Sequence, residues 1–90
     1  MAYPKTVKTI HSKCHLALIK LIRKARQDAG KRQAEISKQM GKQANWMSRI
    51  EKADRRIDVC QFLELADLIG FDPVKLLREV DQARNKRNRR

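Results

Sequence analysis

Apolar residues recur at helical spacing in the first third of the chain. Leu18, Ile22, Ala25 and Ala29 follow one another at intervals of four, three and four residues, with Ile19 and Leu21 beside them. Such intervals place side chains on one face of an α-helix. Ser12 is a suitable N-cap for this helix, and Gly30 is a suitable stop. We therefore predict a first helix between these two residues.

Two shorter helical segments follow, separated by a turn. The first spans residues 33–40, where Ile36 and Met40 lie four residues apart, and the second spans residues 44–52. The turn between them is Gly41-Lys42-Gln43. In the second segment Met47 and Ile50 are three residues apart, which places both in the core. Short helices joined this way are typical of a helix-turn-helix, whose second helix enters the DNA major groove, although helical hairpins have other uses.

The last third of the chain predicts two more helices. Asp58 and Gln61 form a capping box at the start of a fourth helix, which Gly70 ends. Its expected apolar face is Val59, Phe62, Leu63, Ala66 and Ile69. Asp72 and Pro73 begin a fifth helix as N-cap and first residue. That helix is expected to be lined by Val74, Leu77 and Val80, with Leu76 adjacent.

The length and composition fit one all-α domain. Ninety residues leave no room for a second core, and aromatic residues make up only 4% of the chain. We divide it into a basic N-terminal arm (1–11), a helical domain (12–83, with the helix-turn-helix at about 33–52) and a flexible basic tail (84–90). No apolar run is long enough to span a membrane, and no secretory signal is evident.

Charge is distributed unevenly along the sequence. Of the net charge of +12, residues 1–53 carry 13 Lys or Arg and 3 Asp or Glu, which is a net of +10. Residues 54–81 have a net charge of −3, and residues 82–90 a net charge of +5. A polarised excess of positive charge predicts a polyanionic partner, and nucleic acid is the commonest one. An anionic membrane surface is the weaker alternative, because the basic arm lacks an aromatic or Leu-rich amphipathic face.

The segment from Gly30 to Glu51, GKRQAEISKQMGKQANWMSRIE, resembles the Cro/C1-type (XRE) repressor domain. Arg55-Arg56-Ile57-Asp58, Leu65-Ala66 and Gly70-Phe71-Asp72-Pro73 extend the resemblance, which covers about residues 15–80. It implies a five-helix, lambda-repressor-like DNA-binding domain of bacterial or phage origin that works in the cytoplasm at the nucleoid. Three positions depart from the family. Lys31 replaces an apolar residue, while Arg32 and Gln43 replace Ser or Thr helix caps, which suggests that stability is exchanged for phosphate contact.

The resemblance also implies the residues that contact double-stranded DNA. Asn45 and Arg49, one helical turn apart, match base-reading positions and suit adenine and guanine respectively. Further base contacts are expected from Gln43, Ala44 and Ser48. Phosphate contacts are expected from Gln33, Arg32, Lys31, Lys42, Lys52, Arg55 and Arg56.

Other chemistry-bearing residues receive structural interpretations. The family implies a buried ion pair between Arg26 and Glu51 that orients the recognition helix. Trp46 is expected to pack at the protein edge, with contact to DNA as the alternative, and Cys60 to be a buried apolar residue. His11, Cys14 and His15 share one helical face but lack a fourth zinc ligand nearby, so we expect no metal and no cofactor. No catalytic motif is present, and we expect no enzyme activity.

The partners remain open at the level of sequence. Cro/C1-like domains gain affinity by dimerising on palindromic sites, and Phe71, Val74 and Leu77 are candidate contacts for a homodimer unless they complete the core. One alternative is an antitoxin, which would bind DNA and also bind a toxin protein through the acidic segment 54–81. Another is a basic protein that binds nucleic acid without sequence preference.

Overall fold

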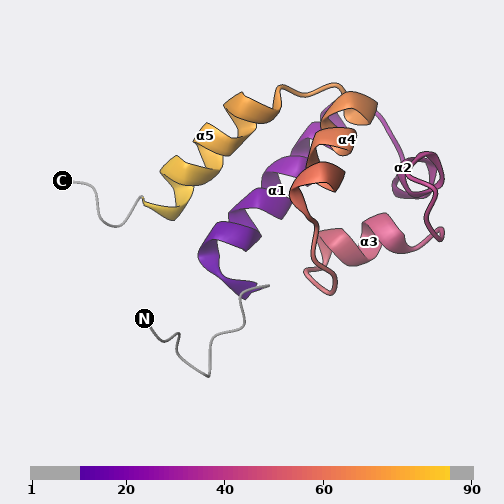
Figure 1. The fold of residues 1–90 in the computed structure, drawn as a ribbon, viewed down its shortest axis with the longest axis horizontal. Helices are drawn as coiled ribbons and strands as arrows, with labels where there is room; N and C mark the ends of the chain where they lie inside the picture. The colour runs from indigo at the N-terminus through magenta and orange to yellow at the C-terminus, as the bar shows by residue number, and fades with distance from the viewer. Residues whose placement is uncertain (1–10, 86–90) are drawn as a thin grey trace.

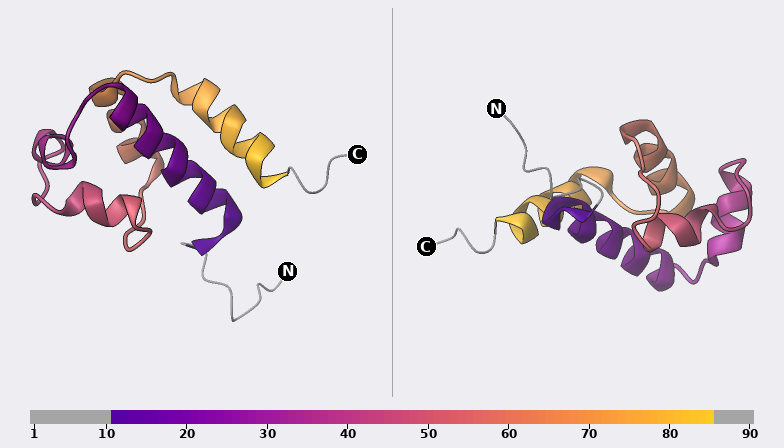
Figure 2. Two further views of the ribbon diagram at one scale, coloured as in Figure 1. Left: turned by 180° about the vertical axis from the view of Figure 1, so that it is seen from behind. Right: turned by 90° about the horizontal axis from the view of Figure 1, so that it is seen from below.

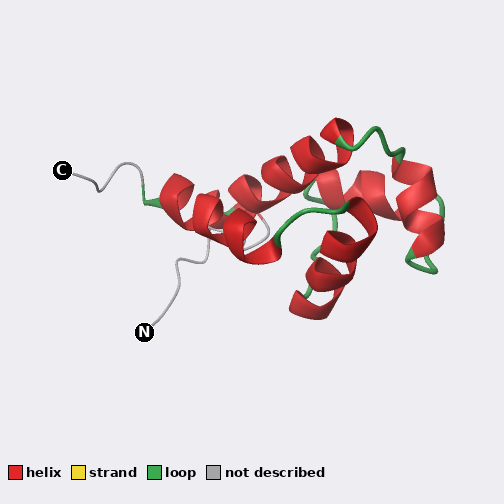
Figure 3. Cartoon of the chain, turned by 90° about the horizontal axis from the view of Figure 1, so that it is seen from above, coloured by secondary structure: helices red, strands yellow, loops and turns green. Residues whose placement is uncertain are grey.

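The computed structural model describes residues 11–85, and within them it contains five helices and no strand (Figures 1 and 3). The helices are α1 (Lys13–Asp28), α2 (Gln33–Gln39), α3 (Trp46–Glu51), α4 (Val59–Ile69) and α5 (Pro73–Arg84). The all-α, five-helix fold predicted from the sequence is therefore confirmed. The predicted arm and tail lie almost wholly outside the described residues.

Three helices begin at the caps that the sequence predicts. The Ser12 hydroxyl accepts a hydrogen bond from the His15 backbone N–H at 3.1 Å. At α4, Asp58 Oδ1 accepts from the Gln61 backbone at 2.7 Å, and Gln61 Oε1 accepts from the Asp58 backbone at 3.2 Å, which completes a capping box. Asp72 Oδ1 accepts from the Val74 backbone at 2.9 Å at the start of α5. These bonds satisfy N–H groups that a helix end leaves without partners.

The helices form two groups (Figures 1 and 2). α1 and α5 lie side by side and antiparallel, and α2 and α3 lie beyond the end of this pair where α1 finishes. α2 is seen nearly end-on in Figure 1 whereas α3 lies in the plane, so the two helices cross steeply. α4 packs against α2 and is joined to α5 by a short loop. The shared core contains Ile19, Ile22, Ile36, Trp46, Met47, Ile50, Ala53, Phe62, Leu65, Ile69, Leu76 and Val80.

The core corrects several sequence predictions. In α4 and α5, Leu65 and Leu76 are buried, whereas Val59, Leu63, Val74 and Leu77 are largely exposed. In α1, Ile19 and Ile22 are buried, whereas Leu18, Leu21 and Ala25 are only partly buried and Ala29 is exposed. Each helix carries apolar residues on two neighbouring stripes, and packing against the other helices decides which stripe faces inward. Cys60 is also exposed, since it precedes Phe62 by two residues and so lies on the opposite face of α4.

The third helix, α3, starts later than the sequence predicts. Trp46 is its first residue, whereas Gln43 and Ala44 lie in the preceding turn and Asn45 is the N-cap. No side chain of the N-cap residue caps this helix. Trp46 itself is only 3% exposed, so it is a core residue and does not pack at the protein edge as expected.

Ser37 of α2 caps α3 from outside. Its hydroxyl accepts a hydrogen bond from the Met47 backbone N–H at 2.9 Å and donates to the Gln33 carbonyl at 3.0 Å. The side chain of Ser37 is completely buried, so neither bond competes with water. The start of α3 is thereby fixed to the middle of α2. No sequence pattern predicted this role of Ser37; the only available signal was a small polar residue inside a short amphipathic segment.

The end of α3 is closed by a left-handed residue. The Ala53 N–H donates to the Ile50 carbonyl at 3.1 Å, and the Asp54 N–H donates to the Arg49 carbonyl at 2.9 Å. This pair of bonds is a Schellman motif, and it requires a positive φ at Ala53, which has φ of 61°. Glycine is the usual residue at such a position, so an alanine there did not predict the sharp end of α3.

Replacing Ser37 by alanine tests its capping role. We expect Ser37→Ala to lower the free energy of unfolding by about 1–3 kcal/mol, because the buried Met47 N–H loses its only acceptor. Urea denaturation followed by circular dichroism measures the change. The matched control is Ser48→Ala on the half-exposed side of α3, which should change stability by less than about 0.5 kcal/mol. Equal effects of the two substitutions would contradict the capping role.

Candidate nucleic-acid interface

The residues expected to read bases lie around the start and the outer side of α3. Gln43, Ala44, Asn45 and Arg49 are exposed, and Ser48 is half-exposed. The inner side of the same helix is formed by Trp46, Met47 and Ile50, all buried. The Arg49 N–H donates to the Asn45 carbonyl at 3.1 Å, which places their side chains one turn apart. This six-residue helix is therefore divided into a packed side and a polar, accessible side.

A shallow cleft adjoins the start of α3. Its volume is about 280 Å³, and it is lined by Gly41, Lys42, Gln43, Asn45, Trp46 and Arg55. The turn before α3 and the loop after it therefore meet at one place, although they are separated by the whole helix in sequence. Two of the lining side chains are cationic and none is acidic, so the cleft suits an anion. Lys52 and Arg56 are exposed nearby in sequence.

The expected ion pair between Arg26 and Glu51 is present beneath the helix-turn-helix. Arg26 Nε lies 2.6 Å from Glu51 Oε2, and Arg26 Nη2 lies 3.0 Å from Oε1, so the contact is bidentate. Arg26 Nη1 also donates to the Lys31 carbonyl at 2.8 Å. The Glu51 side chain is only 3% exposed. The pair joins α1 to the last residue of α3 and holds the α1–α2 loop as well.

Gln33 and Arg23 complete the surroundings of Glu51. Gln33 Nε2 donates to Glu51 Oε1 at 2.8 Å, and Arg23 Nε lies 3.9 Å from the same oxygen atom. One carboxylate oxygen thus attracts side chains from both α1 and α2. Arg23 was not among the residues that the sequence singled out. The only signal available was its position three residues before Arg26 in the same helix.

Two of the family departures have structural consequences. The half-buried Lys31 ammonium donates to the Leu68 carbonyl near the end of α4, so it stabilises the C-terminus of that helix. Arg32, the N-cap of α2, is exposed and has no side-chain acceptor; its N–H reaches Glu35 Oε1 at 3.5 Å.

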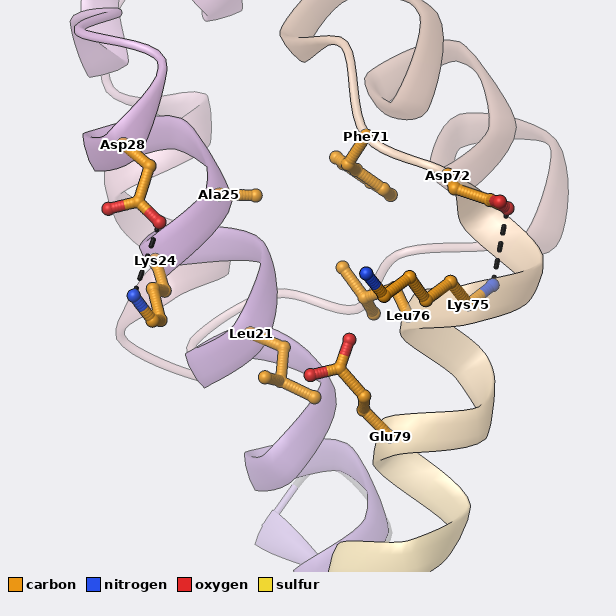
Figure 4. Close-up of a pocket in the computed structure, with 9 residues that line it drawn as sticks. All are labelled: Leu21, Lys24, Ala25, Asp28, Phe71, Asp72, Lys75, Leu76 and Glu79. Carbon is orange, nitrogen blue, oxygen red and sulfur yellow. Dashed lines mark hydrogen bonds and ion pairs between the residues drawn. The ribbon is translucent and has the colours of Figure 1, made fainter.

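A second groove lies on another part of the molecule (Figure 4). It separates α1 from α5, has a volume of about 340 Å³, and is floored by Leu21, Ala25, Phe71 and Leu76. The Lys75 and Glu79 side chains extend into it from α5, and Lys24 pairs with Asp28 on its α1 edge. None of the residues expected to contact DNA lines this groove, so it is not part of the candidate interface.

Comparison with known proteins identifies the class. A family model described as a helix-turn-helix domain matches residues 18–79. The chain therefore belongs to the helix-turn-helix family of the Cro/C1 (XRE) type, which is a family of DNA-binding domains. A search of curated proteins found no match. None of the described helices has the length and apolarity that a membrane span requires.

His15 of α1 lies close enough to Arg56, in the loop after α3, for the two charges to interact. The pKa of its imidazole is lowered below the ordinary value of 6.5, first by desolvation, then by the positive charges of Arg56 and of His11. Its Nε2 atom is buried and has no hydrogen-bond partner among the described residues. Protonation of this imidazole therefore opposes folding.

We expect acid to destabilise the protein through His15. A lowered pKa in the folded state means that the unfolded chain binds more protons below pH 6.5, so stability is present above that pH and is lost as pH falls toward the folded-state pKa. Denaturant titrations between about pH 7.5 and about pH 5.5 measure this slope, which should flatten in His15→Gln. His11→Gln is the matched control and should keep most of the slope. A slope unchanged in His15→Gln would contradict the assignment.

Proposed function

We propose that this protein is a sequence-specific, double-stranded-DNA-binding transcriptional regulator of a bacterial or phage kind. In this proposal α3 lies in the major groove with its exposed side toward the base edges. The observation that supports it most is the division of α3, whose inner residues Trp46, Met47 and Ile50 are buried while Asn45 and Arg49 remain accessible one turn apart. Packing fixes the helix and leaves these two side chains free for recognition.

The accessible side chains have the chemistry that base edges require. The Asn45 amide can donate to and accept from the N7 and N6 positions of adenine, and the Arg49 guanidinium can donate twice to guanine. Gln43 lies in the turn before α3 and offers a second amide, and Ala44 presents a methyl group suited to the thymine methyl. Ser48 is half-exposed and is assigned a secondary contact.

Cationic side chains around α3 are assigned to the DNA backbone. Lys42 and Arg55 face one cleft beside the start of α3, and Lys52 and Arg56 are exposed in the segment after it. Arg32 and Gln33 approach from the start of α2. These contacts fix the register of the protein on the duplex and add affinity that falls with salt, but they read no sequence.

Selection of bound sites from a random DNA pool tests this function. At about physiological salt we expect the wild-type protein to enrich a palindromic sequence, and Asn45→Ala/Arg49→Ala to lose it because the adenine and guanine contacts are gone. The matched control is Arg78→Ala/Gln82→Ala. These two residues are exposed on α5 and lie four residues apart, so the control also removes one arginine and one amide. It should keep the consensus. Tight binding with no enriched sequence in any of the three proteins would indicate non-specific, charge-driven binding instead.

A homodimer is the second part of the proposal. Four apolar side chains of α4 and α5 are largely exposed: Val59 is 73% exposed, Val74 59%, Leu77 48% and Leu63 47%. Leu77 and Val59 line one groove together with Leu18, Ile57, Asp58 and Phe62, and none of these residues is cationic. Two copies that meet on this groove therefore bring no lysine or arginine of its lining together. A second copy is the occupant that we assign to this surface.

Phe71, a third candidate from the sequence, has another role. Its ring lies 5.6 Å from the ring of Phe62 at 47°, and the residue is only partly exposed. It packs against the core cluster, so it supports the loop between α4 and α5 from inside. Val74 and Leu77 are the candidates that remain available to a partner.

Sedimentation of Val74→Ser/Leu77→Ser tests the dimer. We expect the wild-type protein to show a concentration-dependent dimer, and the variant to remain monomeric at the same concentrations because it lacks the apolar contact area. Leu16→Ser is the control, since Leu16 is 43% exposed on α1 outside the groove. It should leave the dimer intact. A wild-type protein that is monomeric both free and on palindromic DNA would contradict this part of the proposal.

A further inference from the structure

We infer that Arg23 and Gln33 form a two-donor clamp for a DNA backbone phosphate, with Glu51 as the anchor that positions both. Arg23 belongs to α1, outside the helix-turn-helix, and no expectation from the sequence assigned it to DNA. The inference rests on the proposed function, because it places the clamp against the strand that flanks α3. The clamp adds a contact that links the DNA backbone, through Arg23 and Gln33, to Glu51, the last residue of α3.

Charge balance around Glu51 leaves Arg23 free to attract a second anion. Arg26 neutralises Glu51 by contacting both carboxylate oxygens, at 2.6 Å and 3.0 Å. Arg23 approaches only one of them, at 3.9 Å, and its side chain is 58% exposed. The cluster of two arginines, one glutamine and one glutamate therefore has a net charge of +1, and that charge sits at its solvent side. Within residues 11–85, Arg23 makes no other ion pair.

Donor geometry supports a shared acceptor. Gln33 Nε2 uses one of its two hydrogens on Glu51 Oε1 at 2.8 Å and retains the other. Arg23 has five N–H donors and directs only Nε toward the same oxygen. The two nitrogens lie 2.8 Å and 3.9 Å from the same Glu51 oxygen atom, so they are close enough for two oxygens of a single phosphate to accept from both. One phosphate can therefore accept from both side chains at once.

The anchor gives the clamp a fixed place relative to base recognition. Glu51 is the last residue of α3, and its side chain is only 3% exposed. It cannot move without breaking the ion pair with Arg26. Gln33 and Arg23 are held to it from two different helices. A phosphate seated between them therefore sets the rotation of α3 in the groove. Glu51 is a positioning residue here, whereas Arg23 and Gln33 are the binding residues.

Salt-dependent binding of Arg23→Met tests the clamp. The probes are two duplexes of equal length, one carrying a site selected by the wild-type protein and one scrambled, measured by fluorescence anisotropy at several salt concentrations. We expect about a tenfold loss of affinity for both duplexes, and a decrease of about 0.9 in the slope of log K against log salt, because one phosphate contact is lost. Arg78→Met, which removes the same charge from the exposed side of α5, should keep the wild-type slope.

A double-substitution cycle with Gln33→Met separates a shared phosphate from two independent contacts. We expect Arg23→Met/Gln33→Met to lose clearly less than the product of the two single losses, since either substitution already opens the clamp. A multiplicative double variant, or an Arg23→Met slope equal to that of Arg78→Met, would overturn the inference. Because the scrambled duplex reports the clamp without base reading, loss of sequence specificity alone would count against the proposed function and leave the clamp standing. Thermal unfolding verifies that each variant is folded.

Discussion

The helix-turn-helix depends on one buried carboxylate. Glu51 lies at the end of α3, and its charge is removed from water, so it requires full compensation from within the protein. Arg26 supplies that compensation with two hydrogen bonds and uses a third to hold the α1–α2 loop. A buried pair of this kind contributes little net stability compared with an apolar replacement, whereas loss of one partner is costly. Its effect here is to define where α3 ends relative to α1.

Ser37 provides the matching constraint at the other end of α3. A helix of six residues is unstable by itself, so its geometry comes from its attachments. Ser37 caps the first turn from α2, Glu51 ties the last turn to α1, and the left-handed Ala53 stops the helix at that point. Between these attachments the inner residues of α3 pack in the core, whereas its outer residues make no contact that the fold requires. Residues on that outer side can therefore vary in sequence without disturbing the fold, which is what a recognition surface requires.

The sequence was sufficient for the starts of α1, α4 and α5, because their side-chain caps are local signals. Asp58 with Gln61, and Asp72 with Pro73, mark their helices by chemistry within four residues. The sequence was insufficient to identify the buried face of a helix that carries two neighbouring apolar stripes. Leu65 is buried and Leu63 exposed, and Leu76 is buried and Leu77 exposed, because of the way α1, α4 and α5 pack together. The same limit applies to the site. The ion pair of Arg26 with Glu51 followed from the family resemblance, but the Ser37 cap, the Lys31 contact with α4 and the place of Arg23 beside Glu51 are tertiary contacts without a local pattern.

The charge distribution couples the two parts of the proposed function. A chain with a net charge of +12 repels its own copies, so the proposed dimer on Val59, Val74 and Leu77 is opposed in free solution by long-range electrostatics. In the proposed complex, DNA phosphates would neutralise the basic half of each copy and remove much of this repulsion, so the duplex would strengthen the proposed contact between copies. Added salt acts in opposite directions on the two steps, since it screens the repulsion between copies and weakens the phosphate contacts. For the proposed complex, the slope of log K against log salt is therefore smaller than the slope expected from the number of its phosphate contacts alone. The difference between the two slopes measures the repulsion that the apolar surface overcomes.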